Sequence, residues 1–118
     1  IVAHQYHRRM NKPERIQLSR KKGWKMPENT VKVDRTTKFG NPFKVGVFRC
    51  FANTDDPNDV VVACPGDLNE AVDAFRWLAE QSDRAEMIQR DLRGKNLACW
   101  CRPGEPCHAD VLLEIANR

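Results

Sequence analysis

The sequence predicts an α/β fold, in which a single small Rossmann-like sheet of three to five strands is flanked by helices. Runs of alternating apolar and polar residues at 15–19 and 30–34 have the period of strands. Apolar residues recur at helical spacing after residue 67. The apolar run 97–99, a Pro-Gly loop and a further helical pattern follow. This order of strands and helices indicates one sheet with helices packed against it.

The first two predicted strands are short. Ile16 and Leu18 alternate with polar residues in the first run. Val31 and Val33 do so in the second, where β-branched side chains favour a strand. The segment 21–29 between them contains Gly and Pro, so we expect a loop there.

Two helices are predicted between residues 67 and 93. Asp67 with Glu70 three residues later is a variant of the capping box. The apolar residues that follow lie on one helical face up to about residue 81: Leu68, Ala71, Val72, Phe75, Leu78 and Ala79. Asp83 with Glu86 repeats the cap signal and predicts a shorter second helix that begins there.

We expect two parts in the chain. Residues 1–14 are polar and aperiodic and form a mobile basic tail, whereas residues 15–118 form a single α/β domain. The chain begins with Ile1, and Met10 would be a natural start. Residues 1–9 are therefore interpreted as a tag, a scar or an upstream extension.

Composition is ordinary for a globular protein, with 41% hydrophobic and 31% charged residues. No apolar run approaches the length of a membrane span, and no leader resembling a signal peptide is present. Five cysteines without such a leader indicate reduced thiols rather than a disulfide framework. We therefore expect a cytoplasmic protein with no membrane partner.

Positive charge is concentrated near the N-terminus. Residues 8–25 contain eight Lys or Arg residues and one acid, Glu14, so this segment carries +7 in a chain of net charge +4. The other residues together carry −3. A basic block of this kind can neutralise the phosphates of a nucleic acid, although a solvated basic tail has the same composition.

The stretch 97–110 is the most informative in the chain. It holds three of the five cysteines and the only histidine outside the N-terminal tail. Cys99 and Cys101, two positions apart at a strand end, point to the same side. Cys107 and His108 fall at the start of a helix, after the loop that ends in Pro106. The four side chains are therefore expected to converge.

A metal site is one interpretation of this convergence. Cys99, Cys101, Cys107 and His108 form a Cys3His set, which suits tetrahedral zinc. The spacing lacks the paired Cys-x-x-Cys knuckles that are typical of structural zinc sites. Adjacent Cys107 and His108 would also both have to turn onto one ion. If only three side chains bind, an open coordination position remains, as in catalytic metal sites.

A thiol site without a metal is the second interpretation. A helix N-terminus that follows a strand can bind an anion and lowers the pKa of a thiol. Cys107 would then be a nucleophile, with His108 or Asp110 carrying or orienting the proton. In the third interpretation the cysteines are only buried packing residues.

A second stretch, residues 35–43, also has polar side chains in a stiff loop. Gly40 permits a positive φ, and Asn41 is held extended by the proline after it. Arg35 and Lys38 could meet an anion. A Gly-Asn-Pro turn alone is common, so the stretch gains meaning only together with the cysteines.

These two stretches resemble a known family. Leu92–Cys101 and Pro106–Leu112 are similar to one motif of the bacterial and phage domain of unknown function 4326. Val33–Arg35 and Lys38–Phe43 look like its other motif, in which an Arg and a Gly-Asn-Pro-Phe turn recur. The resemblance spans about residues 15–117.

The resemblance implies that the Arg35–Phe43 loop and the cysteine loop belong to one pocket. Residues 44–66, between the two motifs, are longer than we expect for the family and are interpreted as an insertion. The family has no settled activity, so the resemblance says little about a reaction.

The leading hypothesis is a domain that binds, and could process, a nucleotide-like anionic ligand. One side of its pocket would be formed by Arg35, Lys38, Gly40 and Asn41. The other side would be formed by Cys99 and Cys101, with Cys107, His108 and Asp110 as the catalytic candidates.

The alternative is a zinc-stabilised, non-enzymatic module that binds nucleic acid through residues 8–25 or binds a protein. Such a module could be encoded by a phage. Zinc is the only cofactor that the sequence suggests, and whether the domain is an enzyme stays open.

Overall fold

The computed structural model describes residues 12–46, 49–51, 60–62 and 65–118. For residues 49–51 and 60–62 only the backbone is described. The interpretation of residues 1–9 as non-native, and most of the predicted basic tail, fall outside the described residues.

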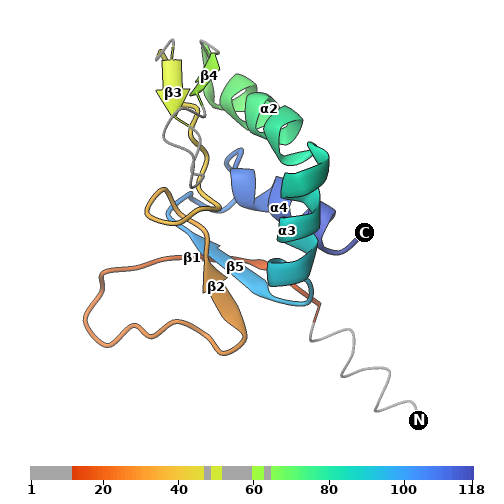
Figure 1. Ribbon diagram of the computed structural model, residues 1–118. Coiled ribbons are helices and arrows are strands. Elements are labelled where there is room, and N and C mark those ends of the chain that lie inside the picture. Colours follow the sequence, from red (N-terminus) through yellow and green to blue (C-terminus); the bar gives the residue numbers. More distant parts are fainter. Residues whose placement is uncertain (1–11, 47–48, 52–59, 63–64) are drawn as a thin grey trace.

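The central sheet has three parallel strands in the order β1-β5-β2 (Figure 1). They are β1 (Arg15–Gln17), β2 (Thr30–Lys32) and β5 (Asn96–Cys99). The strand that comes last in the chain is central, with Leu97 paired to Arg15 on one side and to Val31 on the other. Because β5 is bonded on both edges, Leu97 and Ala98 are fully buried, whereas the edge strands are half-buried. The predicted α/β fold is confirmed.

Three described helices accompany this sheet, namely α2 (Leu68–Ala79), α3 (Ser82–Leu92) and α4 (His108–Ala116). The predicted cap of α2 is present, since the Asp67 carboxylate accepts a hydrogen bond from the Glu70 N–H at 2.9 Å. Helix α4 contacts both other helices as well as β1 and β5. It is apolar on nearly all sides, as expected for a helix that is enclosed by its neighbours.

The start of α3 differs from the prediction. The helix begins at Ser82, with Gln81 at the cap position, and not at the Asp83 cap signal. Only Glu80 and Gln81 separate α2 from α3, and the Gln81 N–H still bonds the carbonyl of Leu78 in α2. This short connection sets where α3 begins. Asp83 instead lies in the first turn, where its charge suits the positive end of the helix dipole.

A separate two-stranded antiparallel sheet lies within residues 44–66, the segment interpreted as an insertion. It pairs β3 (Arg49–Phe51) with β4 (Val60–Val62) and lies apart from the parallel sheet in Figure 1. The Gly46 N–H bonds the Pro65 carbonyl at 2.9 Å, so the two ends of this segment meet. A segment with adjacent ends can be accommodated without moving the strands and helices on either side of it.

None of the helices in the described ranges is long and apolar enough to cross a membrane.

The burial of α4 gives a first prediction. Leu112 is fully buried in the core, and its neighbour Leu113 is only half-buried. Leu112→Ala should lower the free energy of unfolding by about 2–5 kcal/mol, because it leaves a cavity between the sheet and the helices. Leu113→Ala should cost clearly less. Urea denaturation of both variants measures the difference, and equal losses would contradict the enclosed position of α4.

Candidate functional site

Three cysteines converge where the central strand ends. Cys99 is the last residue of β5, Cys101 follows after a bend, and Cys107 occupies the cap position of α4. Their sulfur atoms all lie within 4.8 Å of one another, and those of Cys99 and Cys107 are 3.2 Å apart. Two tetrahedral zinc ligands with bonds of about 2.3 Å would be about 3.8 Å apart. The three cysteines could therefore hold a metal ion such as zinc with small shifts.

The three thiols differ in environment. Cys99 and Cys107 are almost fully buried, whereas Cys101 is partly exposed. Hydrogen bonds from Cys107 and Cys99 lower the pKa of Cys101. Hydrogen bonds with Cys101 and Cys99, together with burial, raise the pKa of Cys107. The most exposed of the three cysteines is therefore the one that most readily becomes a thiolate.

His108 lies beside the cluster, in the first turn of α4. Its Nε2 is 2.5 Å from the carbonyl oxygen of Val33, so the Nε2–H donates to that oxygen. The other ring nitrogen, Nδ1, faces the Cys107 sulfur at 3.8 Å. The imidazole and the ring of Phe75 form a T-shaped pair, with the ring centroids 5.4 Å apart. Among the described residues the tight cluster comprises the three cysteines, and His108 is adjacent to it.

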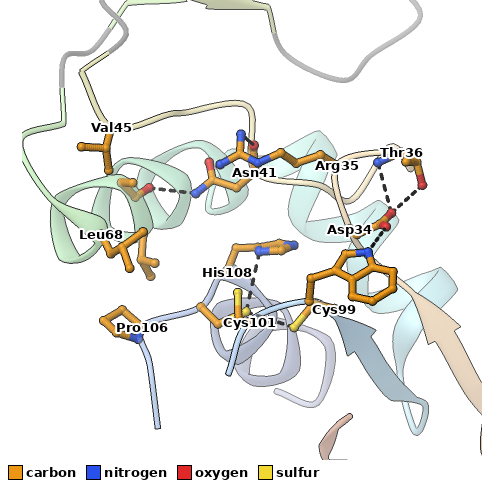
Figure 2. Close-up of a pocket in the computed structure, with 14 residues that line it drawn as sticks. Asp34, Arg35, Thr36, Asn41, Val45, Leu68, Cys99, Cys101, Pro106 and His108 are labelled. Carbon is orange, nitrogen blue, oxygen red and sulfur yellow. Dashed lines mark hydrogen bonds between the residues drawn. The ribbon is translucent and has the colours of Figure 1, made fainter. Parts of the chain in front are cut away.

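A pocket of about 300 Å³ opens next to the cysteines. Figure 2 shows Arg35 and Asn41 on one side of it and the sulfurs of Cys99 and Cys101 on the other, with His108 between them. A third, apolar part of the wall comes from the end of the 35–45 loop, from α2 and from the cysteine loop. Its members are Val45, Leu68, Ala71, Val72 and Pro106.

The polar residues of the 35–43 loop are largely used to build the loop. Arg35 donates to the carbonyl oxygens of Asn41 at 2.8 Å and Phe43 at 3.3 Å. Asn41 is buried, and its side chain donates to the Ala71 carbonyl and accepts from the Phe43 N–H. These bonds attach the loop to α2 and hold it over the pocket.

Gly40 is needed for a different reason from the one predicted. Its φ is not in the positive region. A Cβ at this position would lie 2.5 Å from the carbonyl oxygen of Asp34 and 2.6 Å from the Cα of Arg35. The loop folds back on its own backbone here, and only a residue without a side chain allows that approach.

The protein-family model described as a domain of unknown function, DUF4326, matches residues 16–118 of the chain. The chain belongs to the DUF4326 family. No curated protein and no solved structure matches it. In this DUF4326 domain the two motifs that carried the resemblance line the same pocket.

Three of the predicted site residues of the DUF4326 domain lie elsewhere. The ammonium group of Lys38 pairs with Asp91 at 2.9 Å, and hydrogen bonds from Arg90 and Lys38 lower the pKa of Asp91 to about 2. Gly40 is packed against backbone, as described above. Asp110 pairs with Arg15 at 2.9 Å and lines a second hollow of about 360 Å³, which shares only Cys101 with the main pocket.

Asp34 and Trp100 are pocket residues that we did not predict. The Asp34 carboxylate accepts hydrogen bonds from the N–H and hydroxyl of Thr36 and, at 3.0 Å, from the indole N–H of Trp100 (Figure 2). Burial raises the pKa of Asp34, but these bonds and the charge of Lys32 outweigh it, so the pKa lies below its usual value. An Asp side chain often accepts a hydrogen bond from the backbone N–H two residues later, and this tendency could have indicated the bond from the Thr36 N–H.

The close approach at Gly40 gives the second prediction. Gly40→Ala should lower the free energy of unfolding by about 1–3 kcal/mol or more, because the added methyl meets backbone that cannot move aside cheaply. Gly66→Ala is the matched control, since its Cβ would meet only the flexible Glu70 carboxylate, at 3.0 Å. Thermal and urea unfolding of both variants make the comparison. A Gly40→Ala protein as stable as the Gly66→Ala protein would contradict the geometry of the loop.

Proposed function

We propose that this DUF4326 domain holds a zinc-class metal ion through Cys99, Cys101 and Cys107 and binds a small, nucleotide-like anionic ligand in the adjoining pocket. The observation that carries the proposal is the convergence of three sulfurs at the edge of a pocket that both family motifs line. Thiolates are ligands that select zinc and similar borderline or soft metals.

Three protein ligands leave one position of a tetrahedral ion for a ligand or water, as in catalytic zinc sites. Cys99, Cys101 and Cys107 all line the pocket, so that position is within reach of a bound molecule. Two of the five N–H groups of Arg35 bond loop carbonyls, and its positive charge remains in the pocket wall. An anionic group in the pocket would be attracted by the charge of Arg35 and could occupy the open position on the metal.

One observation favours the alternative, in which the metal only stabilises the fold. The Nδ1 of His108 is 3.8 Å from the Cys107 sulfur, and the corresponding ligand distance on a tetrahedral zinc ion is about 3.6 Å. The carbonyl of Val33 already orients the ring in the way that second-shell acceptors orient zinc-bound histidines. His108 would then complete a closed Cys3His site and leave no position for a ligand.

Metal analysis gives the third prediction. Protein purified without a metal-affinity step should contain one zinc ion per chain, and Cys101→Ser and Cys107→Ser should each lose it. Asp110→Asn, which lies in the second hollow, should keep it. His108→Ala should also keep the zinc ion, because the proposal assigns the ion to the three cysteines. Elemental analysis measures the zinc content of each protein. A wild-type protein that has reduced thiols and contains no metal would contradict the proposal.

Cobalt separates the two kinds of metal site. In cobalt-loaded protein an open position should bind added ligands, so adenosine monophosphate should shift the visible absorption bands. In a closed Cys3His site the bands should not respond to the nucleotide, but should change in His108→Ala. The second outcome would favour the stabilising metal.

Filling the pocket gives the fourth prediction. Adenosine monophosphate should raise the melting temperature of the wild-type protein. Val72→Phe, on the apolar wall, should reduce that shift by occupying the pocket while the zinc content stays unchanged. Thermal-shift measurements with elemental analysis of the same samples provide the test. If nucleotides, bases and sugar phosphates all leave the melting temperature unchanged, the ligand half of the proposal is wrong.

A further inference from the structure

Trp100 is an exposed aromatic residue in a fixed position. It lies between Cys99 and Cys101 in the chain, lines the pocket, and has 40% of its surface exposed. Its N–H is bound by the carboxylate of Asp34, which is itself buried and held by Thr36. The guanidinium of Arg20 lies over the ring, 4.6 Å from its centroid. A tryptophan that is both exposed and held in one orientation is a surface on which a planar group can stack.

Arg20 also begins a run of positive charge. Lys21, Lys22 and Lys25 follow it, all of them exposed, and no Asp or Glu occurs between Glu14 and Glu28. None of these four cations is in an ion pair within the part of the chain that the structure describes. By contrast, Arg15, Lys38, Arg76 and Arg118 each have a carboxylate partner.

The loop that carries these four cations leads away from the end of β5. The loop leaves β1 next to the end of β5, where the Leu18 N–H bonds the Cys99 carbonyl. Figure 1 shows it extending away from the three helices before the chain enters β2. The cations therefore begin beside a residue that lines the pocket, with Arg20 over the Trp100 ring, and continue along a loop that leads away from the helices. One nucleotide in a pocket of about 300 Å³ would leave the outer lysines without a phosphate to contact.

We infer that the partner of this surface is a single-stranded nucleic acid, with one base stacked on Trp100 at the pocket and the neighbouring phosphates on the 20–25 loop. The inference rests on the proposed function, since it extends the nucleotide-like ligand of the same pocket into a strand. Stacking on an aromatic ring is tolerant of base identity, and phosphate contacts are not specific for sequence. Binding should therefore be sensitive to salt and only weakly dependent on sequence.

The test uses the full chain and a fluorescently labelled oligothymidylate of about ten nucleotides, within the usual length of single-strand sites. Fluorescence anisotropy at several salt concentrations should show binding that weakens as salt rises. Trp100→Ala should lower the affinity by about fivefold or more, the low end of what one stacked base contributes. Trp77→Ala is the matched control, because Trp77 is 63% exposed on α2 and does not line the pocket.

The lysines are tested through the salt dependence. Lys21→Ala combined with Lys22→Ala should reduce the slope of log K against log salt by about 1.4, the value for two single-strand phosphates. Arg90→Ala combined with Lys95→Ala removes the same charge from α3 and from the residue before β5, and should leave the slope unchanged. Trp100→Phe keeps a ring in the loop without the bond to Asp34, and should retain more affinity than Trp100→Ala.

Three results would overturn the inference. They are an absence of strand binding by the wild-type protein, equal affinities of Trp100→Ala and Trp77→Ala, and binding of adenosine monophosphate as tight as that of the oligonucleotide. The last would show that the pocket takes a free nucleotide. Zinc content and the thermal shift with adenosine monophosphate are measured on the same samples. A protein that keeps both of these and fails to bind the strand overturns this inference alone.

Discussion

The hydrogen bond from His108 to the carbonyl oxygen of Val33 joins the three parts on which the site depends. Val33 follows β2 directly, and its N–H bonds the Ala98 carbonyl of β5. His108 is the first residue of α4, which is the helix in contact with both other helices and the sheet. One buried imidazole thus fixes the start of α4 relative to the ends of two neighbouring strands. Cys107 and Cys99, on either side of this junction, are brought together as a result.

The same junction explains why the pocket lies where it does. In open parallel sheets the carboxyl ends of the strands form the edge at which ligands bind. Here β5 ends in Cys99, the loop after β2 contributes Asp34 and Arg35, and the N-terminus of α4 closes the third side. The apolar wall from α2 adds a surface of different character. The pocket is therefore lined by polar groups, by sulfurs and by aliphatic side chains on different parts of its wall.

Much of this arrangement could be predicted from the sequence, because it depends on local patterns. The strand pattern that ends at Cys99 and the Pro-containing helix start are enough to predict that Cys99, Cys101 and Cys107 converge, although Cys101 lies beyond the end of β5. The pairing of the two loops came from the family resemblance, and the periodicity alone does not contain it. The bonds between Lys38 and Asp91 and between Asp34 and Trp100 join residues far apart in the chain. No local pattern specifies such pairs, so the use of Lys38 in an ion pair and the fixed indole could not be foreseen.

The position of the cysteines also bears on whether a metal would serve stability or function. Cys99 and Cys107 are eight residues apart, and each belongs to an element that the core already holds. Linking so short a loop removes less entropy from the unfolded chain than a link between distant segments would. The domain also has a continuous core around α4 and β5, unlike small zinc modules that have too few apolar residues to fold alone. A metal here would add little to a fold that is already determined, and its position beside the pocket favours a role in binding.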